Sequence, residues 1–362
     1  MRREAVAAWR SADDSGDDNA DGTRAPAAPC RPRSRCRSKA REQVRALLGV
    51  KGSQGGHQGV SVDALGFSIR YAGEQGGRAG VTGNASWSPG SVCWVDVSST
   101  DLARSREFYS GLFGWTYQID SHSGREQDLT ALCGGRPLAG LSGVAVPAGH
   151  RAAWTLYLAS ADVVRTAQVL DRWGGQVLSG PVDVPGQGRV LIGVDPTGGV
   201  IGFWQRARPW MFRRIAPGSL YWAELDTWDG ARADAFFAVL FGYQQRQIGD
   251  GIDVDYTTWS RHGETMLGRL RMNEDWADPN CAAHWLLHFT VAPKIGTDAA
   301  VHRVLTLGGR VDIDPYDTEL GRIARVADPS GATFALIDPT NRVDAAAYLA
   351  AGPARVDDPY DD

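Results

Sequence analysis

Several features that would place this chain in a specialised class of protein are missing from its 362 residues. No apolar run approaches the roughly 18 residues that a membrane span needs, so a transmembrane protein is not expected. Five cysteines are too few and too scattered for a disulfide scaffold, and the N-terminal stretch lacks the apolar segment of a signal peptide. We therefore expect a protein of the cytoplasm.

A strong excess of charge is also missing. The formal net charge of −4 gives no basic field that could hold phosphate backbones, so nucleic acid is not expected as a partner. The sequence contains no GxxxxGK[ST], HExxH or GxSxG motif and no complete GxGxxG motif. The common nucleotide, zinc-protease and serine-hydrolase sites are thereby excluded.

Residues 1–90 form a tail that is rich in Gly, Ser, Ala, Pro, Arg and Asp and poor in apolar periodicity. Such a segment buries too little surface to offset the entropy of ordering it, so we expect a disordered low-complexity tail. Residues 340–362 are expected to form a short C-terminal tail.

The region between the tails contains an internal repeat. Without a gap, and at an offset of 128 residues, SVCWVDVSSTDLARSREFYSGLFGW (91–115) matches SLYWAELDTWDGARADAFFAVLFGY (219–243). Near the end of each copy, GRVLIGVDPTGGVIGFW (188–204) matches GRIARVADPSGATFALI (321–337). The repeat predicts two homologous modules, module 1 at 91–206 and module 2 at 219–339, joined by a linker at 207–218.

Each module has two similar halves. A short alternating strand leads into a helix, which we expect to be capped by Thr100 or Ser160, and about three further strands follow. This order occurs four times in the folded region. The sequence therefore predicts an α+β fold of four βαβββ units.

These patterns resemble the vicinal oxygen chelate superfamily, which includes glyoxalase I, bleomycin-resistance proteins and extradiol dioxygenases. The resemblance covers about residues 91–339 and lies nearest to two-module, glyoxalase-like proteins that are often labelled hydroxylases by homology. It implies that two βαβββ units curl into a half-open barrel around a cup. A tandem repeat then implies two cups.

Strand alternation predicts which residues face each cup. In module 1 these are Trp94 and Asp96, Thr155 and Tyr157, then Val200, Gly202 and Trp204. In module 2 they are Trp222 and Glu224, then His284, Leu286 and His288, then Thr333, Ala335 and Ile337.

The resemblance also implies where metal ligands would lie in metal-dependent members. The matched positions hold Trp94, Thr155 and Gly202 in module 1, and Trp222, Leu286 and Ala335 in module 2. None of these side chains is a strong metal ligand, and a catalytic ion needs about three N or O ligands. We therefore expect neither a metal nor another cofactor.

Two kinds of residue are candidates for function. His288 and Glu224 would form a proton-transfer couple in module 2, with Tyr157 and Asp96 as the poorer counterpart in module 1. The alternative is that these histidines line the cup and the acids accept structural hydrogen bonds. Trp94, Trp204 and Trp222 would form aromatic walls that stack flat organic molecules, or would pack as core.

The leading hypothesis is a metal-independent binder of a small aromatic natural product or antibiotic, with ligand contacts from the cup residues and a role in resistance or biosynthesis. One alternative is a metal-free lyase, isomerase, cyclase or hydroxylase-type tailoring enzyme that uses Glu224 and His288. Another is an interaction protein whose cups are filled with side chains. Whether a reaction is catalysed stays open, as does the oligomeric state, a homo-oligomer included.

Overall fold

The computed structural model describes residues 88–119, 128–143, 152–184, 186–207, 217–248, 251–252, 254–274, 277–318 and 320–342. Most of the two predicted tails and most of the linker lie outside these residues. No helix in the described part of the chain is long and apolar enough to span a membrane.

Each module consists of two half-modules with the order strand, helix, three strands, as the sequence predicts. The first half of module 1 comprises β1 (Val92–Ser99), α3 (Leu102–Phe113), β2 (Thr116–Ile119), β3 (Asp128–Cys133) and β4 (Arg136–Gly143). Its second half comprises β5 (Ala153–Ala159), α4 (Val163–Arg172), β6 (Gln176–Val184), β7 (Gly188–Val194) and β8 (Val200–Arg206).

Module 2 repeats this order. Its first half comprises β9 (Leu220–Thr227), α5 (Gly230–Phe241), β10 (Gln244–Ile248), β11 (Tyr256–Arg261) and β12 (Glu264–Arg271). Its second half comprises β13 (His284–Thr290), α6 (Gly296–Thr306), β14 (Arg310–Thr318), β15 (Gly321–Ala327) and β16 (Thr333–Asp338).

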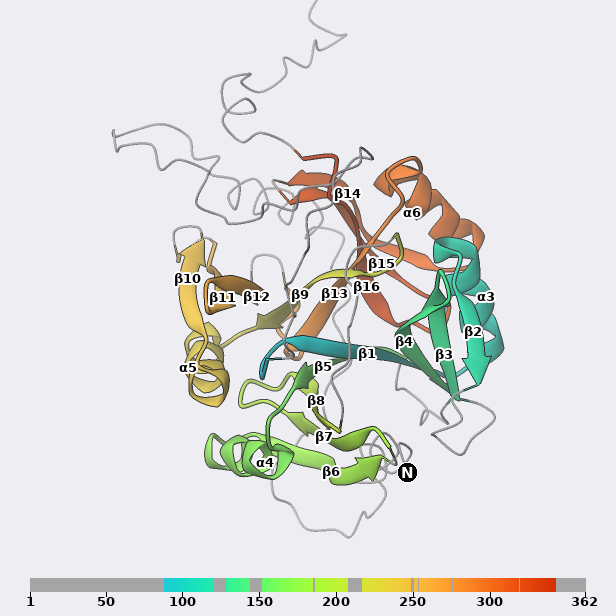
Figure 1. Ribbon diagram of the computed structural model, residues 1–362. Coiled ribbons are helices and arrows are strands. Elements are labelled where there is room, and N and C mark those ends of the chain that lie inside the picture. The colour runs from blue at the N-terminus through green and yellow to red at the C-terminus, as the bar shows by residue number, and fades with distance from the viewer. Residues whose placement is uncertain are drawn as a thin grey trace, which may run out of the picture.

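The two modules form two eight-stranded mixed sheets of identical topology (Figure 1). The strand orders are β2-β3-β4-β1-β5-β8-β7-β6 and β10-β11-β12-β9-β13-β16-β15-β14. The leading strands of the two halves, β1 with β5 and β9 with β13, pair antiparallel at the middle of each sheet. The predicted α+β fold of four βαβββ units is confirmed.

An aspartate caps the N-terminus of each of the two helices of module 1. Asp101 Oδ1 accepts a hydrogen bond from the backbone N–H of Arg104, and Asp162 Oδ1 accepts from those of Val164 and Arg165. The prediction that Thr100 or Ser160 caps these helices is therefore wrong by one or two residues, because the carboxylate reaches the free N–H groups of the first turn.

The two modules share one hydrophobic core, which contains side chains from the helix-covered faces of both sheets. Helix α3 of module 1 packs against α6 of module 2 (Figure 1). In this interface Tyr109 donates a 3.1 Å hydrogen bond to Asp328, and the rings of Phe108 and Phe334 lie 6.3 Å apart. Helix α5 of module 2 contacts the end of α4 of module 1, because Arg232 of α5 donates a hydrogen bond to the carbonyl of Trp173, the residue after α4. The first half of each module is thus joined to the second half of the other.

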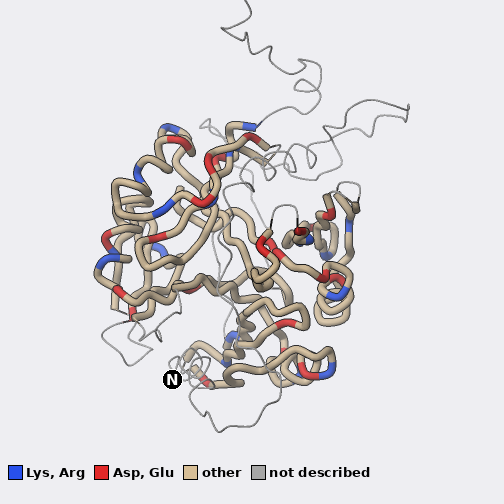
Figure 2. Tube along the Cα trace, turned by 180° about the vertical axis from the view of Figure 1, so that it is seen from behind, with Lys and Arg blue, Asp and Glu red and all other residues tan. Residues whose placement is uncertain are grey.

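Acidic and basic residues are interspersed along the described chain in the view of Figure 2. They do not gather into one continuous basic stripe in that view.

Candidate functional site

The face of each sheet that turns away from the helices is called here the cup face. The alternation predicted for β1 holds, because Val95 and Val97 lie in the shared core, whereas Trp94 belongs to a separate cluster on the cup face. In module 2, Leu286 and Ala335 belong to the corresponding cluster. The two cup faces therefore lie where the strand pattern places them, and their contents can be compared.

The cup face of module 1 is filled by three aromatic rings. Trp94, Tyr157 and Trp204 are each at most 3% exposed, and the rings of Trp94 and Tyr157 lie 6.4 and 6.0 Å from that of Trp204. Gly202 allows this packing, because a Cβ atom there would lie 2.2 Å from the ring of Tyr157. The predicted aromatic wall is present, but its rings cover one another.

The acid of module 1 is also engaged within the protein. Asp96 accepts a 2.5 Å hydrogen bond from Nε1 of Trp94, and it lies so close to Gly140 that a Cβ there would be 1.9 Å from Oδ1. Thr155 lies opposite Asp96 on β5 and is half-buried. The carboxylate of module 1 is held by an indole rather than presented to a ligand.

A β-bulge adds one residue to each cup face that alternation does not predict. The pairing of β1 with β5 shifts between Val92 and Trp94, so Cys93 joins Trp94 on the cup face, and Tyr221 takes the same place in module 2. Burial raises the pKa of the Cys93 thiol well above its ordinary value. Cys93 is therefore not a reactive thiolate.

The cup face of module 2 carries a chain of hydrogen bonds. Trp222 Nε1 donates to the hydroxyl of Tyr256 at 2.9 Å, and that hydroxyl donates to Oε2 of Glu224 at 2.8 Å. The Glu224 side chain is 12% exposed, so it is the acid of this face with some access to solvent. Burial raises the pKa of Glu224, against the opposing effects of Tyr256 and Arg325. A carboxyl with a raised pKa is suited to exchange a proton near neutral pH.

The structure brings His288 near Glu224, as the proposed couple requires. Nε2 of His288 lies 3.8 Å from Oε1 of Glu224, which is longer than a hydrogen bond. Burial and the charge of Arg325 lower the pKa of His288 to about 3, so the imidazole is neutral at physiological pH. Of the two residues, Glu224 is the one whose protonation can change near pH 7.

Three further residues complete this polar cluster: Asp226, His284 and Arg325. Nη2 of Arg325 lies 2.7 Å from Nε2 of His284, and its Nη1 lies 3.5 Å from Oδ2 of Asp226. Because a guanidinium only donates, Nε2 of His284 must accept, and its Nδ1 then donates to the carbonyl of Ala282 at 3.0 Å. Burial and Arg325 lower the pKa of His284 to about 3, which agrees with this neutral tautomer.

The sequence contained a partial signal for this cluster. Alternation placed His284 on the cup face, and the same rule extended by two residues from Glu224 reaches Asp226. Alternation in the leading strands gives no signal for Arg325, because this residue lies on β15. The strand order of the folded sheet brings it near the cluster.

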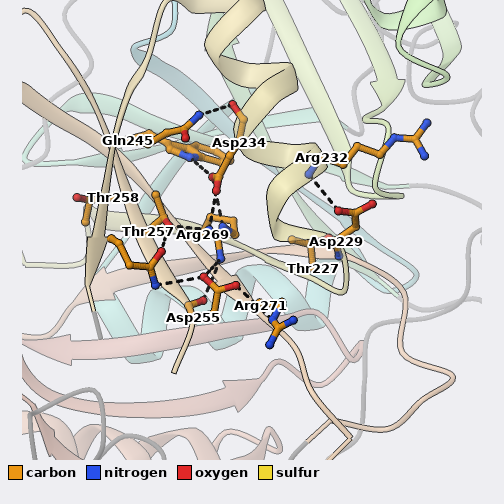
Figure 3. Close-up of polar contacts among 12 residues, drawn as sticks. Thr227, Asp229, Arg232, Asp234, Gln245, Asp255, Thr257, Thr258, Arg269 and Arg271 are labelled. Carbon is orange, nitrogen blue, oxygen red and sulfur yellow. Dashed lines mark hydrogen bonds and ion pairs between the residues drawn. The ribbon is translucent and has the colours of Figure 1, made fainter. Parts of the chain in front are cut away.

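A second buried polar cluster lies on the opposite, helix-covered face of module 2 (Figure 3). Arg269 binds Asp234 of α5 and Asp255 at 2.6 Å each and donates to Thr257, while Trp259 Nε1 also donates to Asp234. These partners come from α5, from β11 and, for Asp255, from the residue just before β11. We therefore assign this cluster to holding α5 on the sheet.

The family resemblance implies metal-ligand positions at Trp222, Leu286 and Ala335 in module 2. Of these residues, Leu286 and Ala335 lie in an apolar cluster. Among the described residues, no three or more His, Cys, Asp and Glu side chains are arranged to hold a metal ion. The centre of the module 2 cluster is taken by the guanidinium of Arg325. The absence of a bound metal stays a prediction.

Comparison with known proteins places these observations in context. Residues 92–203 match the model of the Glyoxalase/Bleomycin resistance protein/Dioxygenase superfamily. The anthracycline biosynthesis proteins DauV of Streptomyces sp. (strain C5) and DnrV of Streptomyces peucetius are each 30% identical over 266 residues, which span 70% of this chain and 94% of the relative. The Mn(II)-bound glyoxalase of Novosphingobium aromaticivorans is 15% identical, with a TM-score of 0.48 over 71% of this chain and 84% of that one.

Proposed function

Because the chain belongs to the glyoxalase/bleomycin resistance protein/dioxygenase superfamily, we propose that it binds a small aromatic natural product on the cup face of module 2. Two relatives carry names from anthracycline biosynthesis, and this motivates the choice of an aromatic ligand made by a biosynthetic route. Module 1, whose cup face is filled, would act as a scaffold.

The observation that carries this proposal is a set of buried polar atoms without partners. Oδ1 of Asp226 and Nε of Arg325 have no hydrogen-bond partner among the described residues. Unmade hydrogen bonds of buried groups are expensive, so such atoms favour a ligand that supplies the missing contacts. Aromatic and aliphatic side chains surround them and would contact a flat ring system: Tyr221, Tyr316, Leu286, Ile323 and Ile337.

Fluorescence titration with anthraquinones tests binding, and the repeat offers a matched pair of variants. Trp222→Leu is expected to weaken binding by about 1–3 kcal/mol, the scale of a lost aromatic contact. Trp94→Leu changes the equivalent residue of module 1 and should leave affinity within about twofold. Equal losses in both variants, or no binding to the parent protein, would overturn the assignment to module 2.

Metal independence is tested on the same preparations. Because no strong ligands occupy the matched positions, elemental analysis should find no stoichiometric Zn, Fe, Ni or Mn, and a chelator should leave ligand affinity unchanged. One tightly held ion per chain would contradict the proposal.

A second candidate function is proton transfer on the bound ligand, with Glu224 as the acid or base. The raised pKa and partial exposure of Glu224 favour it. Glu224→Gln should then lower turnover about a hundredfold or more while the ligand still binds, since general acid-base groups contribute about 10²–10⁴ in rate. Asp96→Asn is the matched control in module 1. If Glu224→Gln weakens binding and leaves turnover unchanged, the acid serves recognition alone.

A further inference from the structure

Arg325 is a buried cation whose charge the protein neutralises incompletely. Its side chain is 9% exposed, and its closest partner is the neutral imidazole of His284. The nearest carboxylate oxygen, Oδ2 of Asp226, lies 3.5 Å away. Burial and the neighbouring Glu224 raise the pKa of Asp226, so that carboxyl tends to be protonated. A guanidinium in this position attracts a further negative oxygen.

The register of the sheet leaves Arg325 next to a small residue. Arg325 on β15 pairs with Ala335 on β16, which pairs with His288 on β13, which pairs with Trp222 on β9. Ala335, whose side chain is a methyl group, is thus the residue between Arg325 and His288 in this row. The unpartnered Nε of Arg325 therefore belongs to a residue whose neighbour in the row has only a methyl side chain.

We propose that this row recognises an acidic hydroxyl group on an aromatic or conjugated ring, a phenol or an enol, and binds it as the oxyanion. This inference rests on the proposed function and specifies the ligand. In the binding step the O–H bond of the ligand breaks, its proton passes to the carboxylate of Glu224, and the ligand oxygen accepts a hydrogen bond from Nε–H of Arg325. No other reactant is needed, and the net charge of the complex is unchanged.

Conservation of charge is the reason to choose a hydroxyl over a carboxylic acid. A carboxylic acid arrives ionised at neutral pH and would add a second negative charge beside the carboxylate of Glu224. An acidic hydroxyl instead moves one negative charge from Glu224 to the ligand, and Arg325 keeps a single strong partner. Glu224 is suited to accept that proton because burial already raises its pKa.

Four further ionisable groups of this face carry no charge at neutral pH, whereas Arg342 is a cation that donates to the hydroxyl of Tyr221 at 3.3 Å. Burial raises the pKa of Tyr256 and Tyr316 and lowers the pKa of both histidines, so all four are neutral. The groups that face the proposed oxyanion are drawn from five strands: Glu224 and Asp226 of β9, Tyr256 of β11, His284 and His288 of β13, Tyr316 of β14 and Arg325 of β15.

Three probes that share one ring system test the inference: a monohydroxyanthraquinone, anthraquinone itself and an anthraquinone carboxylate. The hydroxylated probe absorbs at longer wavelength once ionised, so its pKa can be measured both free and bound to the full chain. We expect binding to lower that pKa by about one unit or more, a tenfold preference for the anion. We also expect the hydroxylated probe to bind more tightly than the other two.

Variants of Arg325 assign the effect to this side chain. Arg325→Met should abolish the pKa shift and weaken the hydroxylated probe about tenfold while changing the affinity for anthraquinone by less than about twofold. Arg325→Lys keeps the charge and should keep part of the shift. Arg322→Met, on the same strand but bound to Asp298 and Asp317 at the surface, should change neither.

The outcomes separate this inference from the proposed function. If the hydroxylated probe binds with an unshifted pKa, if Arg325→Met keeps the shift, or if the carboxylate probe binds most tightly, the oxyanion proposal is wrong and binding stands. If none of the probes binds, the proposed function fails and the inference fails with it. Should Arg325→Met not fold, the pKa of the probe bound to the parent protein and to Arg325→Lys decides.

Discussion

One row of residues in each cup face shows how the two modules differ within a shared fold. The row in module 1 runs from Ile192 through Gly202 and Tyr157 to Trp94. The equivalent row in module 2 holds Arg325, Ala335, His288 and Trp222. Three of the four positions differ in chemistry, although the pairing of the strands is the same.

The difference lies in how each row fills its space. In module 1 a large ring, Tyr157, lies over a residue without a side chain, and the result is an apolar cluster. In module 2 a smaller ring lies beside a methyl group, and a buried cation with an unpartnered nitrogen takes the place of isoleucine. Both rows are buried, with Trp94 and Tyr157 2% and 3% exposed and Trp222 and His288 4% exposed each, so the modules differ in the chemistry of the row and not in its burial. The unsatisfied polar groups of module 2 are what favours binding there.

The largest effect is expected from opening the filled cup face. Trp204 is fully buried, so Trp204→Ala should lower the free energy of unfolding by about 3–5 kcal/mol through the cavity that it leaves. Ligand affinity at module 2 should change little when measured well below the unfolding transition. Urea unfolding gives the first quantity and fluorescence titration the second. Val239→Ala, at a position that is 60% exposed, is the control for the unfolding measurement.

Ligand binding that disappears in folded Trp204→Ala would show that module 1 contains the site. That outcome would reverse the comparison between the two modules.

A smaller effect is expected from exchanging the paired residues of the two rows. Gly202→Ala should lower the free energy of unfolding by about 1–3 kcal/mol, because the new Cβ meets the ring of Tyr157. Adding Tyr157→His gives module 1 the pair that module 2 carries, and much of the loss should be recovered. A double-mutant cycle by urea unfolding measures the interaction, and independent, additive losses would show that the two positions do not depend on each other.

Sequence pattern could predict the fold because each level of the pattern gave the same answer. The ungapped match of residues 91–115 to 219–243 defined the repeat, and alternation in the leading strands placed Trp94 and Glu224 on the cup faces. The local signals of strand, helix and turn all agreed with the four βαβββ units that the structure contains.

The contents of the cup faces were harder to predict, since they depend on contacts between distant strands. Cys93 and Tyr221 reach the cup face through β-bulges, which break strict alternation. Arg325 meets Asp226 and His284 across strands that are far apart in the chain. Nothing in the period of a strand shows that Tyr157 lies over Gly202 and thereby closes one cup face.

The acids of module 2 should make stability fall over a higher pH range than the buried acid of module 1 does, since burial raises the pKa of Asp195 to about 6 and that of Asp226 to about 8. The pKa of Asp226 is raised in the folded state, so between its ordinary value near 4 and its folded value the native protein holds more protons than the unfolded chain. Stability from this group is therefore present at low pH and lost as the pH rises. Asp226→Asn should flatten the decline between about pH 6 and 8 by about 1–2 kcal/mol.

Thermal unfolding across this pH range measures the slope. The lowered pKa values of His284 and His288 act in the opposite direction between about pH 3 and 6.5, which is why the alkaline side is the informative one. Ser98→Asn, at the equivalent position of module 1, should shift the whole curve without changing its slope. An unchanged slope in Asp226→Asn would mean that the carboxyl is ionised in the folded protein.

The smallest effect is expected from removing the predicted N-terminal tail. The deletion must end before the residues that contact both modules. Residues 1–87 lie outside the described residues, and their composition predicts no contribution to the core. The next residues join the modules: Pro89 accepts a hydrogen bond from Arg261 of module 2, and Gly90 accepts one from Tyr243 and donates to Ala159 of module 1.

Deleting residues 1–87 should therefore change the melting temperature by no more than about 1–2 °C, whereas deleting residues 1–91 should cost about 1–3 kcal/mol. The two truncations differ only in the segment that contacts both modules, so each serves as the control for the other. A large loss of stability in the shorter deletion would show that the tail packs on the folded region. Equal and small losses in both would show that the contacts of Pro89 and Gly90 contribute nothing to holding the modules together.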